Sequence, residues 1–519
     1  MTTAIASATD LPRRNAGLWP DAPAMWFSGR TTTYAELDRL SSRCANALIA
    51  AGVRPQDRVG VLAKGCDDFF ILWLGCLKAR ACLAPVNWRL APPEVEFILR
   101  DAGVRLLFCG AEYAGLVTGL KDRVDALDQV VQFEPGSPDW PDFRAWIAAA
   151  DDADPQLPAQ ADDDVIQLYT SGTTGLPKGV QLTQANYLAL FESASQSWAP
   201  VSPGESVLVA MPLFHVAGAN FGMLSFLGGG RAVILPEADP GAILRLMGDQ
   251  KLVHAFLVPA LINMLLQHPD LAGADFSTLR RVYYGASPIS EEVLNRARAA
   301  FGAGFVQLYG LTETIGAGAW MSPEAHDPAL GKLRACGRPS PGFEIRVRTA
   351  GRDAAPHEVG EIEIRSAGVM KGYWNRPEAT AEAIDAQGWF RSGDAGYFDE
   401  DGFLFIHDRV KDMIVSGGEN VYPAEVENAL FSHPDVADAA VIGVPDEKWG
   451  EAVKAMVVLR PGCEPDTASI ISHCRGLIAG YKVPKTVDFV PLLPRNPSGK
   501  VLRRELRAPY WEGRARQVS

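Results

Sequence analysis

The sequence predicts an α/β protein with a large N-terminal domain of layered strands and helices and a small C-terminal α+β domain. Two observations carry this prediction. Apolar, strand-length segments alternate with helix-compatible segments through most of the first 400 residues, and near Gly388 the pattern changes to short strands separated by turn signals. Alternation of the first kind is typical of a parallel sheet covered by helices. The 519 residues also exceed the roughly 250 to 300 that one hydrophobic core usually organises, so at least two domains are expected.

The expected elements follow one another along the chain as strand, helix and strand. Residues 59–62 and 82–86 are apolar strands on either side of a helical stretch at 69–77. The strand pattern returns in four later segments, each followed by a helix-compatible stretch: 206–211, 231–235, 254–258 and 281–284. The acidic, proline-broken segment 148–164 is predicted to be a surface connection between two such subdomains.

The C-terminal region has signals of its own. Residues 399–402 are predicted to form a hairpin turn between two short strands. A helix is expected to begin at Pro423, because proline is favoured at the first helical position. We therefore expect an N-terminal domain at residues 1–410 and a C-terminal domain at residues 411–519, the latter of ordinary domain size.

Composition and charge exclude several classes of protein. The 49 basic and 62 acidic side chains give a formal net charge of −13, which argues against a general nucleic-acid binder. The eight cysteines form no C-x-x-C pair and have no histidine nearby at metal-ligand spacing, so neither a disulfide framework nor a zinc site is expected.

The sequence shows no signal peptide or membrane span. Charged residues precede any apolar run of signal-peptide length, and no uncharged apolar stretch of about 18 residues follows. We expect a soluble, cytoplasmic protein with no transmembrane segment.

The strongest local signal is a loop rich in glycine and hydroxyl groups at residues 169–179. It follows the apolar strand 165–168, and its three glycines let backbone amides approach an anion. Lys178 adds a point charge for phosphate oxygens. The loop is not a Walker A motif, because Lys178 lies between Pro177 and Gly179 and a strand-like segment follows. The sequence therefore predicts a phosphate-binding loop, with a flexible surface loop as the alternative.

This loop resembles the phosphate-binding signature of the adenylate-forming superfamily, which includes acyl-CoA synthetases, peptide-synthetase adenylation domains and beetle luciferases. Three further segments resemble the superfamily's other signatures and occur in its order: 309–313 (YGLTE), 392–394 (SGD) followed by 408–412, and 494–500 (PRNPSGK). The resemblance therefore covers nearly the whole chain. It implies an enzyme of the acyl-CoA synthetase type, a small barrel-like part within the N-terminal domain, and a mobile C-terminal domain.

The resemblance implies an ATP site, and the residue types suit that chemistry. Tyr309 offers a flat face for adenine, and Asp394 can accept hydrogen bonds from ribose hydroxyls. Thr312 can hydrogen-bond a phosphate, and Glu313 is a hard oxygen ligand suited to Mg²⁺. Without the resemblance, the alternatives are a buried core tyrosine, a turn-stabilising aspartate and a solvated loop glutamate. The expected ATP-binding residues are Thr170, Ser171, Gly172, Thr173, Thr174, Lys178, Gly285, Ala286, Ser287, Leu308, Tyr309, Gly310, Thr312, Asp394, Arg409 and Lys500.

Formation of an acyl-adenylate brings a carboxylate against an α-phosphate, and the two anions repel each other. A cation that bridges them in the transition state is therefore the expected catalyst. Lys500 matches the superfamily's catalytic lysine, and Arg409 resembles its ribose- and phosphate-contacting arginine. The expected catalytic residues are Lys500, Thr312, Glu313 and His215, the last at the mouth of the acyl pocket. A solvated lysine and a buried structural histidine are the alternatives for Lys500 and His215.

A thioester product would require one active site to run two reactions. Lys411 lies where the superfamily has a hinge residue, so the C-terminal domain is expected to rotate between the two steps. The rotation would remove Lys500 and bring a second set of residues to coenzyme A. That set is Ser416, Gly417, Gly418, Glu419 and Trp449. An exposed linker lysine is the alternative for Lys411.

The expected acyl pocket is apolar and contains small residues. Its residues are His215, Ala219, Tyr283, Gly310, Ile315 and Gly316. They leave room for a bulky acid and supply no cation for a second carboxylate. We expect a medium- or long-chain fatty acid or another bulky hydrophobic acid, with an aryl, arylalkanoate or cinnamate-type acid as the alternative.

The resemblance also implies what the protein binds. The expected co-substrates are ATP and coenzyme A, with Mg²⁺ at Glu313 as the metal. No nucleic-acid partner is expected, and a homodimer is left open. A luciferase-like oxygenase and a noncatalytic nucleotide-binding regulator are remote alternatives to the ligase.

Overall fold

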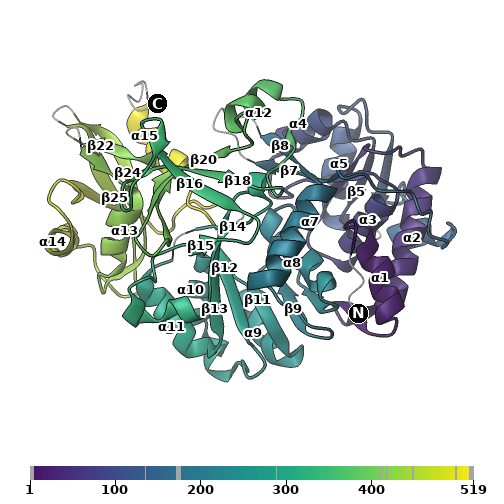
Figure 1. Cartoon of the computed structure of the whole chain (residues 1–519), viewed down its shortest axis with the longest axis horizontal. Coiled ribbons are helices and arrows are strands. Elements are labelled where there is room, and N and C mark those ends of the chain that lie inside the picture. The colour runs from purple at the N-terminus through teal and green to yellow at the C-terminus, as the bar shows by residue number, and fades with distance from the viewer. Residues whose placement is uncertain are drawn as a thin grey trace.

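The computed structural model describes residues 5–134, 136–170, 177–287, 289–409, 412–416, 419–446, 449–496 and 499–512, without the side chains of 407–409, 415, 419 and 420. The described strands form four sheets, three of them before residue 410 and one after residue 411. In Figure 1 a small third sheet lies between the C-terminal sheet and the two large N-terminal sheets. Among the described residues, no helix combines the length and apolar character that a membrane crossing requires.

The first large sheet has seven strands in the order β19-β8-β7-β4-β3-β5-β6. They are β3 (Arg58–Leu62), β4 (Cys82–Pro85), β5 (Leu106–Cys109), β6 (Gln129–Gln132), β7 (Asp164–Thr170), β8 (Lys178–Thr183) and β19 (Gly372–Tyr373). The helices of this part are α2 (Tyr34–Ala50), α3 (Asp67–Lys78), α4 (Pro92–Ala102), α5 (Ala114–Lys121), α6 (Phe143–Ala148) and α7 (Gln184–Ser193). The elements β3, α3 and β4 confirm the strand–helix–strand unit predicted at residues 59–86, and the two strands pair in parallel.

The segment predicted as a connection between subdomains follows α6 and leads into β7. Most of its residues from 149 to 163 are exposed or half-buried, and it contains no helix or strand. It is therefore a surface connection, as predicted. However, β6 and β7 belong to the same sheet, so the segment does not join two subdomains.

The second large sheet has nine strands in the order β15-β14-β13-β12-β11-β9-β10-β1-β2. They are β1 (Pro23–Phe27), β2 (Arg30–Thr33), β9 (Ser206–Val209), β10 (Arg231–Ile234), β11 (Leu252–Phe256), β12 (Arg281–Gly285), β13 (Gly304–Gly310), β14 (Gly318–Met321) and β15 (Arg338–Pro339). Its helices are α1 (Asp10–Leu18), α8 (Val216–Leu227), α9 (Pro240–Asp249), α10 (Pro259–Gln267) and α11 (Glu291–Phe301). The four later predicted strands are β9 to β12, and all lie in this sheet. Strands β9 to β13 pair in parallel, so their carboxyl ends meet at one edge.

The third sheet has five strands in the order β17-β16-β18-β20-β21. They are β16 (Glu344–Thr349), β17 (Arg352–Asp353), β18 (Gly360–Arg365), β20 (Phe390–Phe398) and β21 (Leu404–Arg409), with helix α12 (Pro377–Ala383) preceding β20. This sheet corresponds to the expected barrel-like part, but β17 and β21 do not pair with each other among the described residues, so the sheet stays open. The predicted hairpin joins β20 to β21, where the Gly402 amide donates to the Asp399 carbonyl at 3.1 Å.

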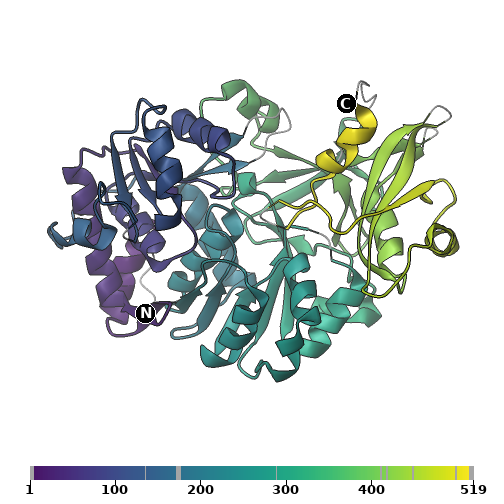
Figure 2. The same cartoon turned by 180° about the vertical axis from the view of Figure 1, so that it is seen from behind.

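The C-terminal sheet has the order β23-β22-β25-β24, with β26 beside β25. Its strands are β22 (Ile414–Ser416), β23 (Glu419–Val421), β24 (Val436–Asp446), β25 (Gly450–Leu459) and β26 (Thr486–Phe489). Its helices are α13 (Pro423–Phe431), α14 (Thr467–Leu477) and α15 (Arg503–Trp511), and α13 begins at the predicted proline. Figure 2 shows the yellow C-terminal segment before α15 running back toward the teal strands of the nine-stranded sheet. The domain boundary at residues 410 and 411 stays a prediction, since both lie outside the described residues.

The two large sheets share one hydrophobic core, and α3 lies within it. Every residue of α3 is buried, which places the helix between layers rather than on a surface. Phe70 of α3 contacts Phe226 of α8 with ring centroids 5.6 Å apart. The approach is close because α8 carries Gly222, where a Cβ would lie 2.2 Å from Phe70 Cζ. The indole nitrogen of Trp73 donates a hydrogen bond to the Val165 carbonyl of β7 at 3.2 Å, which ties α3 to the seven-stranded sheet.

We expect Trp73→Ala to lower the free energy of unfolding by about 3 to 5 kcal/mol, because loss of the buried indole leaves a cavity in the shared core. Urea unfolding followed by far-UV circular dichroism measures the loss. Met264→Ala, at a side chain that is 53% exposed, is the control and should change the value by less than about 0.5 kcal/mol. Equal losses in the two variants would contradict the position of Trp73 in this core.

Candidate active site

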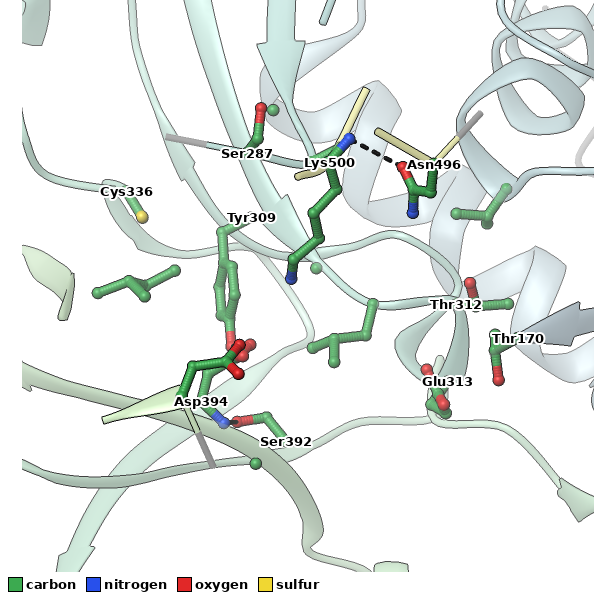
Figure 3. Close-up of a pocket in the computed structure, with 18 of the residues that line it drawn as sticks. Thr170, Ser287, Tyr309, Thr312, Glu313, Cys336, Ser392, Asp394, Asn496 and Lys500 are labelled. Carbon is green, nitrogen blue, oxygen red and sulfur yellow. Dashed lines mark hydrogen bonds between the residues drawn. The ribbon is translucent and has the colours of Figure 1, made fainter. Parts of the chain in front are cut away.

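A cavity of about 1940 Å³ lies where the carboxyl ends of the nine-stranded sheet meet the third sheet and the C-terminal segment. Its walls combine residues from β7, β8, β12, β13 and β20 with the loop before α15. The predicted site residues that line it are Thr170, Lys178, His215, Gly285, Ala286, Ser287, Leu308, Tyr309, Gly310, Thr312, Glu313, Asp394 and Lys500. Residues that are up to 330 positions apart in sequence therefore face one cavity, as Figure 3 shows for several of them.

Two predicted residues reach the cavity because their strands are neighbours. Strands β12 and β13 end at Gly285 and Gly310 and pair in parallel, so their ends lie at the same edge. A Cβ at Gly285 would lie 2.2 Å from the Leu308 carbonyl oxygen. A Cβ at Gly310 would lie 2.5 Å from the Ala317 amide nitrogen. Both positions therefore require glycine for the backbone segments to pack this closely.

A buried hydrogen bond connects the nine-stranded sheet to the third sheet. The Tyr309 hydroxyl donates to Asp394 Oδ2 at 2.9 Å. Burial, followed by the nearby Asp394 charge, raises the pKa of Tyr309 well above its usual value, so the hydroxyl keeps its proton and remains a donor. The Asp394 amide donates to Ser392 Oγ at 3.0 Å, which holds the end of the turn. The carboxylate is thus held at the cavity wall, where the sequence predicts a ribose contact.

Glu313 is oriented by a residue that the sequence analysis did not identify. The Tyr373 hydroxyl donates to Glu313 Oε1 at 2.9 Å, and the Met370 amide donates to the Glu313 carbonyl at 2.8 Å. Lys178 Nζ lies 4.9 Å from the centroid of the Tyr373 ring. Tyr373 lies in β19, which pairs with β8, the strand that follows the phosphate loop. Tyr373 therefore contacts both Lys178 at the start of β8 and Glu313, the expected magnesium ligand. No local sequence signal marks Tyr373, because its role arises from this strand pairing.

The residues around Glu313 fit a magnesium ion bound together with phosphate. Among the described residues, no group of three or more His, Cys, Asp or Glu side chains is arranged to hold a metal by itself. A single carboxylate beside the nucleotide is sufficient for Mg²⁺, which usually binds through one or two carboxylates, substrate phosphates and water. Glu313 is such a carboxylate on the cavity wall.

Lys500 lies at the cavity on a tight loop of the C-terminal segment. Its amide donates to Asn496 Oδ1 at 2.8 Å, and the Asn496 amide donates to the Lys500 carbonyl at 2.8 Å. In Figure 3 the Lys500 side chain extends past Tyr309 into the site. A Cβ at Gly499 would lie 3.2 Å from Val258 Cγ2, so the loop packs directly against the nine-stranded part of the molecule. The structure thus brings Lys500 together with the predicted ATP-binding residues.

The predicted coenzyme A residues do not face this cavity where they are described. Ser416 is buried in β22, and Trp449 is 40% exposed at the start of the β25 hairpin. Neither lines the cavity. The remaining expected residues, Lys411, Gly417 and Gly418, and the phosphate-loop residues Ser171, Gly172, Thr173 and Thr174, lie outside the described residues, as do the side chains of Arg409 and Glu419.

His215 immediately precedes α8 and lines the cavity. Its ring lies 4.6 Å from that of Phe214, and its Nε2 is buried without a hydrogen-bond partner among the described residues. Burial, with a smaller effect of Arg89, lowers the pKa of His215 to about 4. The imidazole is therefore neutral near pH 7, which suits a wall that contacts an apolar group better than a binding site for an anion.

The structure brings only part of the expected acyl pocket together. His215 and Gly310 line the cavity, whereas Ala219, Tyr283, Ile315 and Gly316 do not. Tyr283 is buried against Phe221, with ring centroids 5.1 Å apart, and its hydroxyl lies 3.4 Å from His254 Nδ1. Tyr283 is therefore part of the aromatic packing against α8 and does not face the cavity.

Comparison with known protein families agrees with this fold and cavity. A family model described as AMP-binding enzyme matches residues 12–374, and a model described as AMP-binding enzyme C-terminal domain matches residues 425–500. The fold and the cavity together define an adenylate-forming enzyme. The chain belongs to the AMP-binding enzyme family and is an adenylate-forming acid–thiol ligase of the acyl-CoA synthetase type.

Individual relatives cover almost the entire chain. It is 41% identical over 505 residues to a fatty acid–[acyl-carrier-protein] ligase from Streptomyces coeruleorubidus, covering 96% of each chain. It is 40% identical over 506 residues to a feruloyl-CoA synthase from Amycolatopsis sp, covering 96% of this chain and 98% of the relative. Among solved structures, a fatty acyl CoA synthetase from Mycobacterium tuberculosis is 35% identical with a TM-score of 0.76, covering 97% and 98% of the two chains.

We expect the stability of the wild-type protein to fall more steeply on acidification than that of His215→Gln. The folded pKa of about 4 lies below the unfolded value of about 6.5. The contribution of the neutral ring is therefore complete above about pH 6.5 and is lost as the pH falls toward 4. At about pH 5 this loss amounts to roughly 2 kcal/mol, which urea midpoints compared with those at about pH 7.5 would reveal. Identical pH dependence in the two proteins would contradict a histidine that is held neutral in the folded protein.

Proposed function

We propose that the protein activates a hydrophobic carboxylic acid with ATP to form an acyl-adenylate and then transfers the acyl group to coenzyme A. One observation carries this proposal: the same cavity is lined by Lys500, Tyr309, Asp394 and Glu313. These residues supply the cation, the adenine platform, the ribose acceptor and the metal ligand that the first reaction requires.

In the first reaction, a carboxylate oxygen forms a bond to the α-phosphorus of ATP, and the bond from that phosphorus to the bridging oxygen of the β-phosphate breaks. Pyrophosphate leaves, and no proton is transferred. Lys500 offsets the repulsion between the two reacting anions, because its ammonium group can contact both in the transition state. Thr170 and Lys178 lie at the ends of β7 and β8, where they are available to the departing phosphates. Glu313 would hold Mg²⁺, which neutralises charge on the phosphates.

In the second reaction, the thiol of coenzyme A loses its proton to solvent and its sulfur attacks the acyl carbon. The bond from that carbon to the adenylate oxygen breaks, and AMP leaves. Lys500 has no role in this step. We propose that the C-terminal domain, residues 411–519, turns about Lys411 relative to residues 1–410 and brings Ser416 to Glu419 and Trp449 to the site. The change of sheet between β21 and β22 supports a division at this point. Ser416 and Trp449 do not line the cavity whereas Lys500 does, which supports assigning this arrangement to the first reaction.

The acid is proposed to be a medium- or long-chain fatty acid or another bulky hydrophobic acid. The cavity wall near neutral His215 includes the apolar residues Val216, Ala217 and Leu311. Two of the similar proteins have names that refer to fatty acids. An aryl or cinnamate-type acid is the second candidate, because the feruloyl-CoA synthase is almost equally similar to this chain. A luciferase-like oxygenase and a noncatalytic regulator have no corresponding support. A homodimer and a cytoplasmic location stay predictions.

Lys500→Ala is expected to slow acyl-adenylate formation by at least about a hundredfold, because the reacting anions lose their bridging cation. Pyrophosphate release from ATP and acid, without coenzyme A, measures this step. Thioester formation from preformed acyl-adenylate and coenzyme A should change by less than about threefold. Equal losses in the two half-reactions would contradict the proposed role of Lys500.

A screen of acids would separate the two acid classes. Pyrophosphate release is measured over fatty acids of increasing chain length, hydroxycinnamates, arylalkanoates and a dicarboxylate, each with and without coenzyme A. We expect turnover with fatty acids and thioester only in the presence of coenzyme A. If hydroxycinnamates are turned over and fatty acids are not, the result would support the aryl alternative. Turnover of the dicarboxylate alone would contradict an apolar pocket.

A further inference from the structure

The loop that carries Lys500 is closed by its own backbone. The Leu502 amide donates to the Pro494 carbonyl at 2.8 Å, and the Asn496 amide donates to the Lys500 carbonyl at 2.8 Å. The Gly499 amide returns to the Asn496 carbonyl at 2.9 Å. These bonds hold residues 494–496 and 499–502 together, but they do not by themselves fix how those residues are held on the C-terminal sheet.

Arg495 makes that connection. One guanidinium nitrogen, Nη1, donates to the Gly499 carbonyl at 2.6 Å. The other, Nη2, donates to Asp438 at 2.6 Å from Oδ2 and 2.9 Å from Oδ1. Because the Gly499 carbonyl belongs to the peptide that joins Gly499 to Lys500, Arg495 holds the peptide from which the lysine side chain departs. Charge-assisted hydrogen bonds of this kind are short and directional.

Asp438 is presented to Arg495 by an irregularity in β24. The pairing register of β24 with β25 shifts between Val436 and Asp438, while the rest of the ladder continues regularly from Asp438 to Asp446. Such a bulge re-aims the side chains next to it. The Asp438 carboxylate also accepts the Ala439 amide at 3.0 Å through Oδ1, which limits its rotation. The sheet thus offers Arg495 a fixed anion rather than a freely rotating one.

The same loop is braced on its other side by the N-terminal part of the molecule. Gly499 has φ +81°, a left-handed conformation that favours glycine. A Cβ there would lie 3.2 Å from Val258 Cγ2 and 3.7 Å from the Ala260 Cβ. Gly499 is therefore connected to Asp438 through Arg495 and packs against the start of α10. Lys500 directly follows Gly499 in the chain.

We propose that Asp438 is a positioning residue for Lys500 and acts through Arg495. The inference rests on the proposed role of Lys500 in adenylate formation. Asp438 does not line the cavity, so it influences the reaction only by holding the peptide between Gly499 and Lys500 in place. A displacement of about 1 Å at a catalytic group is enough to cost on the order of a hundredfold in rate. The effect belongs to adenylate formation, because Lys500 has no role in thioester formation.

The test measures both half-reactions in Asp438→Asn, with Asp488→Asn as the matched control. Asp488 accepts Lys454 Nζ at 2.7 Å in the same domain, and neither residue lines the cavity. Asp438→Asn should lower the maximal rate of pyrophosphate release by about ten- to a hundredfold, with KM for ATP changed less than about threefold. Thioester formation from preformed acyl-adenylate should be nearly unchanged, and Asp488→Asn should leave the ratio of the two rates at the wild-type value. Equal losses in both half-reactions, or no loss, would overturn the inference.

Two further variants separate positioning from a general structural role. If Asp438→Asn does not fold, Arg495→Lys keeps a cation for Asp438 but lacks the two-sided guanidinium contact, and it should produce the same selective loss. In a Lys500→Ala background, Asp438→Asn should cause almost no additional loss, because residues that act through one group are not additive. A full additional loss would overturn the inference. If Lys500→Ala alone releases pyrophosphate at the normal rate, the proposed role of Lys500 itself is overturned. If Lys500→Ala is slow but Asp438→Asn is normal, only the inference about Asp438 is overturned.

Discussion

The buried hydrogen bond from Tyr309 to Asp394 is the contact on which the arrangement of the site depends. It joins the end of β13 to β20 across 85 positions of sequence. Asp394 lies opposite Arg409 in the pairing of β20 with β21, so the same contact influences where the chain leaves the third sheet for the C-terminal domain. A tyrosine that keeps its proton supplies a donor to a carboxylate that would otherwise lose a hydrogen bond on burial.

The charges around the cavity are distributed according to the proposed chemistry. The chain has a net charge of −13, yet Lys178 and Lys500, which are 322 positions apart in sequence, both face the cavity. Acidic side chains line the cavity as well, so these two ammonium groups act on the phosphates as individual point charges. Burial of its ring lowers the pKa of His215, so this side chain is neutral near pH 7 and adds no charge beside Val216 and Ala217, where an apolar acid is proposed to bind.

Much of the fold and the ATP site could be predicted because their signals are local. Alternating strands and helices, the turn at 399–402 and the helix beginning at Pro423 are all encoded in short segments. Tyr373 and Asp438 could not be predicted, because their partners Glu313 and Arg495 are 60 and 57 positions away. Similarly, nothing local indicated that aromatic neighbours would bury Tyr283, or that the barrel-like sheet would remain open.

The sequence by itself determined the α/β class, the adenylate-forming family and the residue types of the nucleotide site, since a phosphate loop and a lysine-bearing glycine loop need only a few neighbouring residues. Only the tertiary structure decided that Lys500, and not Ser416 or Trp449, faces the cavity. It also decided that Asp438 lies behind the Lys500 loop. The reason is that side-chain packing between distant segments depends on the burial of the whole core, which no single segment specifies.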